Sequence, residues 1–146
     1  MDNELTRESL IDLGGFFITI KLDTESGCDL DEHIIRTDVE LQLRREGVAV
    51  VEDIDWADGA SSDVALLSIY VFALLDSAEK RCIYSIQTSV YQFVILPRNP
   101  SKPTFAVTWS VEFTGCVGRN RIEEIRETIK DQLNKLVNAY LSVNPK

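Results

Sequence analysis

The sequence predicts an α+β fold, a two-layer sandwich in which two helices cover one face of a mostly antiparallel sheet. The chain starts with a strand–helix–strand pattern, continues with three long apolar segments, and ends in a segment with helical periodicity. The expected order of elements is β-α-β-β-β-β-α. With 146 residues the chain fits one domain, 1–146, whose first 13 or so residues are expected to be flexible or foreign to the native protein.

The first half of the chain predicts a parallel strand–helix–strand unit. The segment 15–22 alternates apolar and polar side chains, as a half-buried strand does. A helix is expected over 30–46, and the apolar segment 48–51 then forms a strand parallel to the first.

The expected helix over 30–46 carries start and stop signals. Asp29 or Asp31 supplies the N-cap, and Gly47 ends the helix. Its apolar side is expected to comprise Leu30, Ile34, Ile35, Val39, Leu41 and Leu43.

Three strands are expected next, over 64–75, 82–96 and 104–116. The turns between them, 76–81 and 97–103, are short and polar, so the strands should form an antiparallel meander. In the last strand, alternation predicts one apolar row facing the helices, made of Phe105, Val107, Trp109, Val111 and Phe113. The strand 64–75 is apolar on both sides, which leaves its second side for the N-terminal segment or a dimer contact.

The last element is predicted to be a helix from Arg121 to about Ser142. Its apolar residues recur at intervals of three and four. Asn120 and Glu123 have the spacing of a capping box.

Charge is unevenly spread along the chain. Residues 1–63 hold 17 acidic and 5 basic residues, a net charge of −12, whereas residues 64–146 hold 7 and 10, a net charge of +3. An acidic surface repels phosphate backbones, so nucleic acid is not an expected partner. No apolar run is long enough for a transmembrane segment. Read literally, the start of the chain predicts a cytoplasmic protein; removal of a native leader would make it periplasmic or secreted.

The three cysteines, Cys28, Cys82 and Cys116, do not match a disulfide framework or a paired zinc motif. Cys82 and Cys116 are expected on adjacent strands, where a bond is conceivable but two reduced thiols are favoured. No metal and no cofactor is predicted.

The loop 51–63 places four aspartates beside Trp56. Its acidic residues have the wrong register for an EF-hand, so a solvated loop is expected rather than a calcium site. Trp56 either folds back over the core, which is favoured, or anchors a partner.

A basic cluster is the second candidate site. The meander should bring Lys80 and Arg81 near Arg119 and Arg121 at the start of the last helix, where they would hold an anion or an acidic partner segment. The alternative is ordinary surface charge.

Catalytic motifs are missing from the sequence. His33 is the only histidine, and no nucleophile elbow, Walker loop or dinucleotide fingerprint occurs. The prediction is therefore a protein that is not an enzyme.

Three stretches carry a family resemblance: RTDVELQLRREGVAV (36–50), FAVTWSVEFTGCVG (105–118) and IKDQLNKLVNAYLSVNPK (129–146). They resemble an uncharacterised family of small bacterial proteins, many with an N-terminal leader, that end in Tyr-Leu-x-Val-Asn-Pro-Lys. The resemblance implies no activity and no catalytic residue. The strand–helix–strand start is also similar to small domains of bacterial envelope assembly factors.

The expected function is a non-catalytic binding or interaction module, with the bacterial cell envelope as one setting. The expected partner is a protein or a second copy of the chain, bound by the sheet face without helices and by the loop bearing Trp56. One alternative is a small-ligand or enzyme site between sheet and helices, near His33 or Tyr91. Another is an acidic immunity-type inhibitor that covers a basic toxin.

Overall fold

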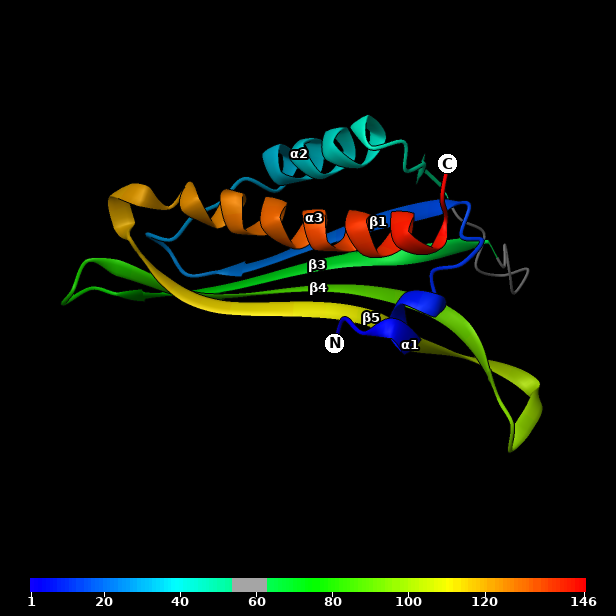
Figure 1. Ribbon diagram of the computed structural model, residues 1–146. Helices are drawn as coiled ribbons and strands as arrows, with labels where there is room; N and C mark the ends of the chain where they lie inside the picture. Colours follow the sequence, from blue (N-terminus) through cyan, green and yellow to red (C-terminus); the bar gives the residue numbers. More distant parts are fainter. Residues whose placement is uncertain (54–62) are drawn as a thin grey trace.

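The computed structural model, which describes residues 1–53 and 63–146, is a two-layer α+β sandwich (Figure 1). Two long helices lie on one face of a five-stranded mixed sheet. The predicted fold class is confirmed. Trp56 and most of the loop 51–63 fall outside the described residues.

The sheet has the strand order β2-β1-β3-β4-β5. β1 pairs in parallel with both β2 and β3, while β3–β4 and β4–β5 are antiparallel. The expected parallel unit and the expected meander are therefore both present. The strands are β1 (Gly15–Thr24), β2 (Val50–Val51), β3 (Val64–Asp76), β4 (Arg81–Leu96) and β5 (Asn99–Gly118).

Helix α2 (Glu32–Arg45) begins and ends at the predicted signals. The Asp31 carboxylate accepts hydrogen bonds from the backbone N–H groups of the first turn, at 2.8 and 3.3 Å. Gly47 adopts a φ of +78° after the last turn, a conformation that suits glycine.

The apolar side of α2 is narrower than predicted. Ile35, Val39 and Leu43 are buried, whereas Ile34 and Leu41 are 42% and 48% exposed. The three buried residues are spaced four apart and form one stripe along the helix, and Ile34 and Leu41 lie on either side of it.

Helix α3 (Glu124–Val143) starts later than predicted, and the expected capping box is wrong. Residues 119–121 form a 3-10 turn, and α3 has Glu123 as its N-cap with no side-chain capping bond. The Glu123 carboxylate instead accepts a hydrogen bond from Arg126 at 2.8 Å.

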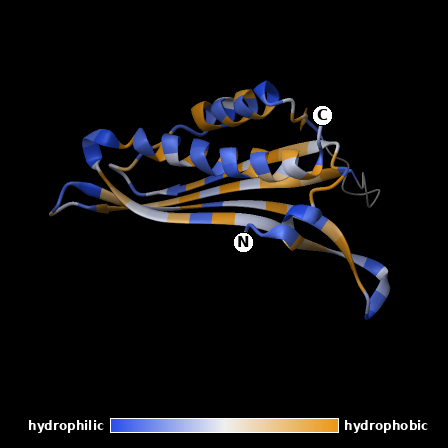
Figure 2. Ribbon diagram, viewed as in Figure 1, coloured by the Kyte–Doolittle hydropathy of each residue, from blue (hydrophilic) through white to orange (hydrophobic). Residues whose placement is uncertain are grey.

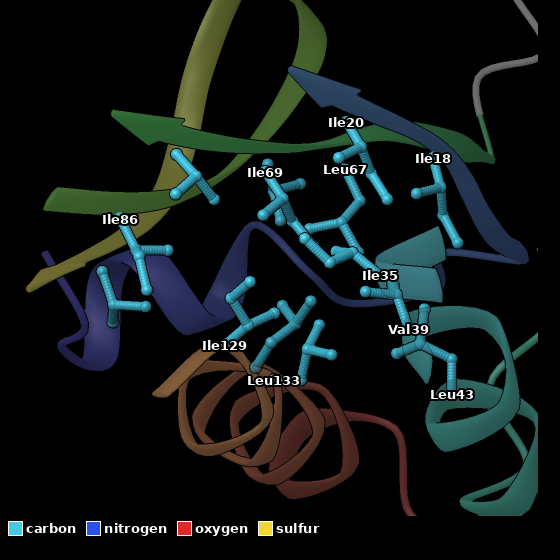
Figure 3. Close-up of a cluster of buried hydrophobic side chains, with 14 of the residues drawn as sticks. Ile18, Ile20, Ile35, Val39, Leu43, Leu67, Ile69, Ile86, Ile129 and Leu133 are labelled. Atoms are coloured by element: carbon cyan, nitrogen blue, oxygen red, sulfur yellow. The ribbon is translucent and has the colours of Figure 1, made fainter. Parts of the chain in front are cut away.

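The core lies between the two helices and the sheet (Figure 3). Ile129 and Leu133 of α3 and the buried stripe of α2 point toward apolar side chains of the strands, which include Ile18, Ile20, Leu67, Ile69 and Ile86. Burial of this apolar surface is the main favourable contribution to folding.

The first 13 residues are packed against the domain, so the expectation of a flexible segment is corrected. They form a short helix α1 (Glu4–Glu8), and Leu10 and Leu13 are 0% and 5% exposed. The Asp2 carboxylate accepts a hydrogen bond from the indole N–H of buried Trp109 at 3.0 Å and two from Arg7. The bonds from Arg7 are the main reason that the pKa of Asp2 is lowered.

A β-bulge in β5 changes the predicted apolar row. Val90 pairs with Trp109, but the next residue, Tyr91, pairs with Val107, so Thr108 is an extra residue. Phe105 and Val107 therefore lie on the sheet face without helices, opposite to Trp109.

The predicted turn 97–103 is also much shorter. β4 and β5 stay paired until Leu96 and Asn99, and together they extend beyond the helices as an arm (Figure 1). We call residues 92–107 the β4–β5 arm.

Cysteine pairing differs from both sequence-based alternatives. Cys28, before α2, forms a disulfide with Cys82 of β4, with 5.9 Å between the Cα atoms. Cys116 is free and exposed. Cys82 pairs in register with Val117, and Cys116 pairs with Ile83, so the two cysteines lie on opposite faces of the sheet.

Candidate functional site

The sheet face that α2 and α3 leave uncovered is the main candidate surface. We call it the helix-free face; it is formed by the side chains of the strands that point away from the core. The strand registers place apolar residues at the two ends of this face and polar residues at its centre. Hydropathy alternates along the strands (Figure 2). Apolar members of this face include Phe17, Leu66, Phe72, Leu74, Ile83, Tyr91, Phe93, Phe105 and Val107.

A depression of about 280 Å³ occupies the polar centre of this face. Strand register explains its lining, because Lys21, Tyr70 and Gln87 form one cross-strand row and Ser68 and Ser89 form the next. Among the described residues, the lining is Lys21, Ser68, Tyr70, Gln87, Ser89 and Tyr91. Three strands thus contribute to one small polar site.

Ser89 is the unusual member of the lining. Its side chain is only 2% exposed, and its Oγ has no hydrogen-bond partner among the described residues. Buried polar groups are nearly always paired, so an unpaired hydroxyl marks a place where a ligand group or water is expected.

Lys21 and Tyr70 are neighbours in the lining of the depression. The Lys21 ammonium lies 5.4 Å from the centroid of the Tyr70 ring, a cation–π contact. The Tyr70 hydroxyl donates to the Asp23 carboxylate at 3.2 Å. Loss of hydration, followed by this carboxylate, raises the pKa of Tyr70, so its hydroxyl stays protonated at neutral pH.

The four basic residues predicted to form an anion site do lie at one end of the sheet. Arg81 pairs in register with Gly118, and the Arg119 amide donates to the carbonyl of Lys80 at 3.0 Å. However, Arg81 pairs with Asp76, and Arg121 pairs with Glu124. Anion binding there stays a prediction.

The expected site between sheet and helices finds little support. Tyr91 lies on the helix-free face, and His33 is an exposed residue in the first turn of α2. Between β4 and α3, the buried polar pair Thr88–Gln132 satisfies its own hydrogen bonds at 2.6 Å. Among residues 1–53 and 63–146, no group of three potential metal ligands is present.

A second depression, of about 290 Å³, lies between α2 and α3. Four of its polar side chains bind one another. Arg126 donates to the Asp38 carboxylate at 2.8 and 3.1 Å, and the Gln42 amide donates to Asn134 at 2.7 Å. These bonds join the two helices, so they have a structural role.

The site on the helix-free face was missed in the sequence because its residues come from three separate strands. The sequence-based prediction puts Tyr91 near a site between sheet and helices and includes neither Lys21 nor Ser89. The available signal was polar residues at alternate positions in otherwise apolar strands.

No helix in the described parts of the chain combines the length and apolar character needed to cross a bilayer.

Comparison with known proteins gives a structural likeness. No family model matches the chain, and no curated protein matches it. A dodecamer of a PelC variant from Paraburkholderia phytofirmans is similar, with a TM-score of 0.51 and 15% identity over 86% of this chain and 90% of that one. A putative neuraminyllactose-binding hemagglutinin homologue from Helicobacter pylori has a TM-score of 0.36 at 12% identity, over 86% and 80%. At this identity, the likeness to PelC shows a shared fold.

Proposed function

We propose that this protein is a non-catalytic interaction module of the bacterial cell envelope, which binds a second copy of itself through the β4–β5 arm and the adjoining helix-free face. The observation that carries the proposal is the arm. It extends beyond the helices (Figure 1) and carries exposed apolar side chains.

The arm presents several exposed apolar side chains close together. Ile95 is 65% exposed, Phe105 42%, and Phe93 and Val107 38% each. The Phe105 ring stacks on Tyr91 at 5.4 Å and contacts Phe93 at 5.2 Å, which orders these rings before any partner binds. A preordered apolar patch loses little entropy on association.

The arm favours contact through side chains over addition of a strand. β5 is an edge strand of the sheet, and Pro100 and Pro103 lie within it. Proline lacks an N–H group and blocks continuous pairing at an edge. The dodecameric state of the PelC protein of similar fold supports a second copy as the partner.

The disulfide supports an envelope location. Disulfides form and persist in oxidising compartments such as the bacterial periplasm. Cys28 and Cys82 are fully buried and bonded.

Sedimentation equilibrium of the purified protein tests the proposal. We expect an oligomer at micromolar concentration, and we expect Ile95→Glu to shift it to monomer, because a buried unpaired carboxylate is costly in an apolar interface. The thermal midpoint of the variant should stay unchanged, since Ile95 is exposed in the monomer.

Leu41→Glu is the matched control. Leu41 is 48% exposed on α2, which lies on the other face of the sheet, so this variant should assemble as the wild type does. A wild-type protein that stays monomeric at micromolar concentration, or equal loss of assembly in both variants, would refute the proposal.

A further inference from the structure

We propose that the depression on the helix-free face binds the carboxylate group of a small organic acid. This goes beyond the interaction module above, because it assigns a ligand chemistry to a defined site at the centre of the face. The inference rests on the donors that line the depression, on the unpaired hydroxyl of Ser89 and on the position of Lys21.

The lining is rich in hydrogen-bond donors. Lys21 carries three N–H donors and no acceptor, Gln87 contributes an amide NH₂, and Ser68 and Ser89 each contribute a hydroxyl. The Tyr70 hydroxyl is already engaged as a donor to Asp23. A lining of this kind complements a ligand that only accepts hydrogen bonds, which is the character of a carboxylate.

Ser89 fixes where such a ligand sits. Ser89 lines the depression, and its buried hydroxyl lacks a partner among the described residues, so an unmet donor lies just beneath the surface of the site. A ligand oxygen placed there would satisfy it. Removing water from this point also strengthens the attraction between a carboxylate and nearby donors.

Lys21 is the cation that should attract a carboxylate, and among the described residues it is the only charged residue in the lining. Two acidic residues lie beside the site: Asp23, whose carboxylate accepts the Tyr70 hydroxyl, and Glu112, which lies opposite Gln87 in register. Both should weaken the attraction, so binding depends on the neutral donors of the lining as well as on Lys21.

The size and walls of the site favour a small acid with a planar apolar part. The volume of about 280 Å³ lies at the lower limit of ligand pockets. Tyr70 and Tyr91 provide aromatic surface for such a part.

Titration of the ¹⁵N-labelled protein with benzoate, followed by NMR, tests the proposal. Saturable shifts are expected at the amides of Ser68, Gln87 and Ser89. Benzyl alcohol and benzylammonium, which share the ring without the anion, should bind about tenfold more weakly or not at all. Equal binding of the three compounds, or no saturable shift with benzoate, would overturn it.

Variants at the site give the second test. Lys21→Gln should weaken benzoate binding about tenfold, and Ser89→Ala should weaken it severalfold, since each removes a donor to a charged group. Glu112→Gln should strengthen binding.

Ser85→Ala and Lys135→Gln are the matched controls. Ser85 lies on the same face outside the lining, and Lys135 is exposed on α3. Both should bind benzoate as the wild type does; loss of binding in these variants to the same degree as in Lys21→Gln would contradict a defined site.

The carboxylate could come from a free acid or from an acidic side chain of the second copy. Saturating benzoate in the sedimentation experiment separates these sources. Unchanged assembly supports a free acid, as proposed, and dissociation by benzoate overturns it in favour of a side chain. Binding of benzoate by the monomeric Ile95→Glu variant keeps this result separate from the fate of the interaction proposal.

Discussion

Two adjacent residues of β4, Thr88 and Ser89, contrast the two faces of the sheet. Both are buried, at 0% and 2% exposure, and both carry a hydroxyl. On the helix-covered face, Thr88 donates to the Gln132 side chain, which in turn donates to the carbonyl of Ile86 at 3.1 Å. On the helix-free face, Ser89 has no partner among the described residues. The covered face satisfies its polar groups internally, and the helix-free face leaves one for a ligand.

From this contrast we expect residues on the helix-covered face to contribute more to the free energy of unfolding than residues on the helix-free face. The largest expected effect comes from the disulfide, because Cys82 lies on that face and the bond closes a loop across 54 positions. The double variant Cys28→Ser/Cys82→Ser should lose about 4 kcal/mol of unfolding free energy, the chain-entropy value for a loop of this length. Urea denaturation followed by circular dichroism measures it.

Cys116→Ser is the control for the disulfide prediction. Cys116 is exposed and unbonded, so this variant should unfold at the wild-type urea concentration. Equal stability of the double variant and the wild type would mean that the bond makes no contribution.

A smaller loss is expected from Thr88→Val. This change keeps the shape of the side chain but leaves the Gln132 carbonyl oxygen without its donor, in a place closed to water. The expected cost is about 2 kcal/mol, the desolvation penalty of a buried unsatisfied group. Urea denaturation of this variant should show a lower midpoint and an unchanged slope.

The double variant Thr88→Val/Gln132→Leu checks the cause of that loss. It removes both partners, so its loss should be smaller than the sum of the two single losses. Additive losses would show that the two side chains do not interact.

Much of the fold could be predicted because its signals are local. Asp31 marks the start of α2 through its side chain, and Gly47 marks its end through its backbone conformation. The meander follows from short polar turns. The N-terminal segment was misjudged, since Leu10 and Leu13 have no strand or helix periodicity around them and are buried only by tertiary contact.

Features that depend on register could not be predicted. The extra residue at Thr108 reverses the face of Phe105 and Val107, and nothing in the sequence near it signals a bulge. The partner of Cys82 depends on the path of the loop before α2, because this loop brings Cys28 to the helix-covered face of the sheet. Sequence distance alone favoured Cys116.

The candidate site depends on strand register even more than these features do. Lys21, Tyr70 and Ser89 belong to three strands, and they meet only when two registers are fixed. Ser89 is an ordinary strand residue in the sequence; its unpaired burial appears only when the neighbouring side chains are in place. The basic cluster was easier to see because Arg119 and Arg121 are close in sequence.

Ser89→Ala is expected to have the smallest effect on stability, and with the opposite sign to Thr88→Val. The wild-type hydroxyl gave up its hydration without gaining a hydrogen bond, so its removal should raise the free energy of unfolding by about 1 kcal/mol. The same change should weaken carboxylate binding, which is the trade-off expected when a functional group is retained at the expense of stability. Urea denaturation of the unliganded variant measures the gain. A loss of stability comparable with that of Thr88→Val would mean that Ser89 has a structural partner, and the contrast between the two faces would fail at the residue on which it depends.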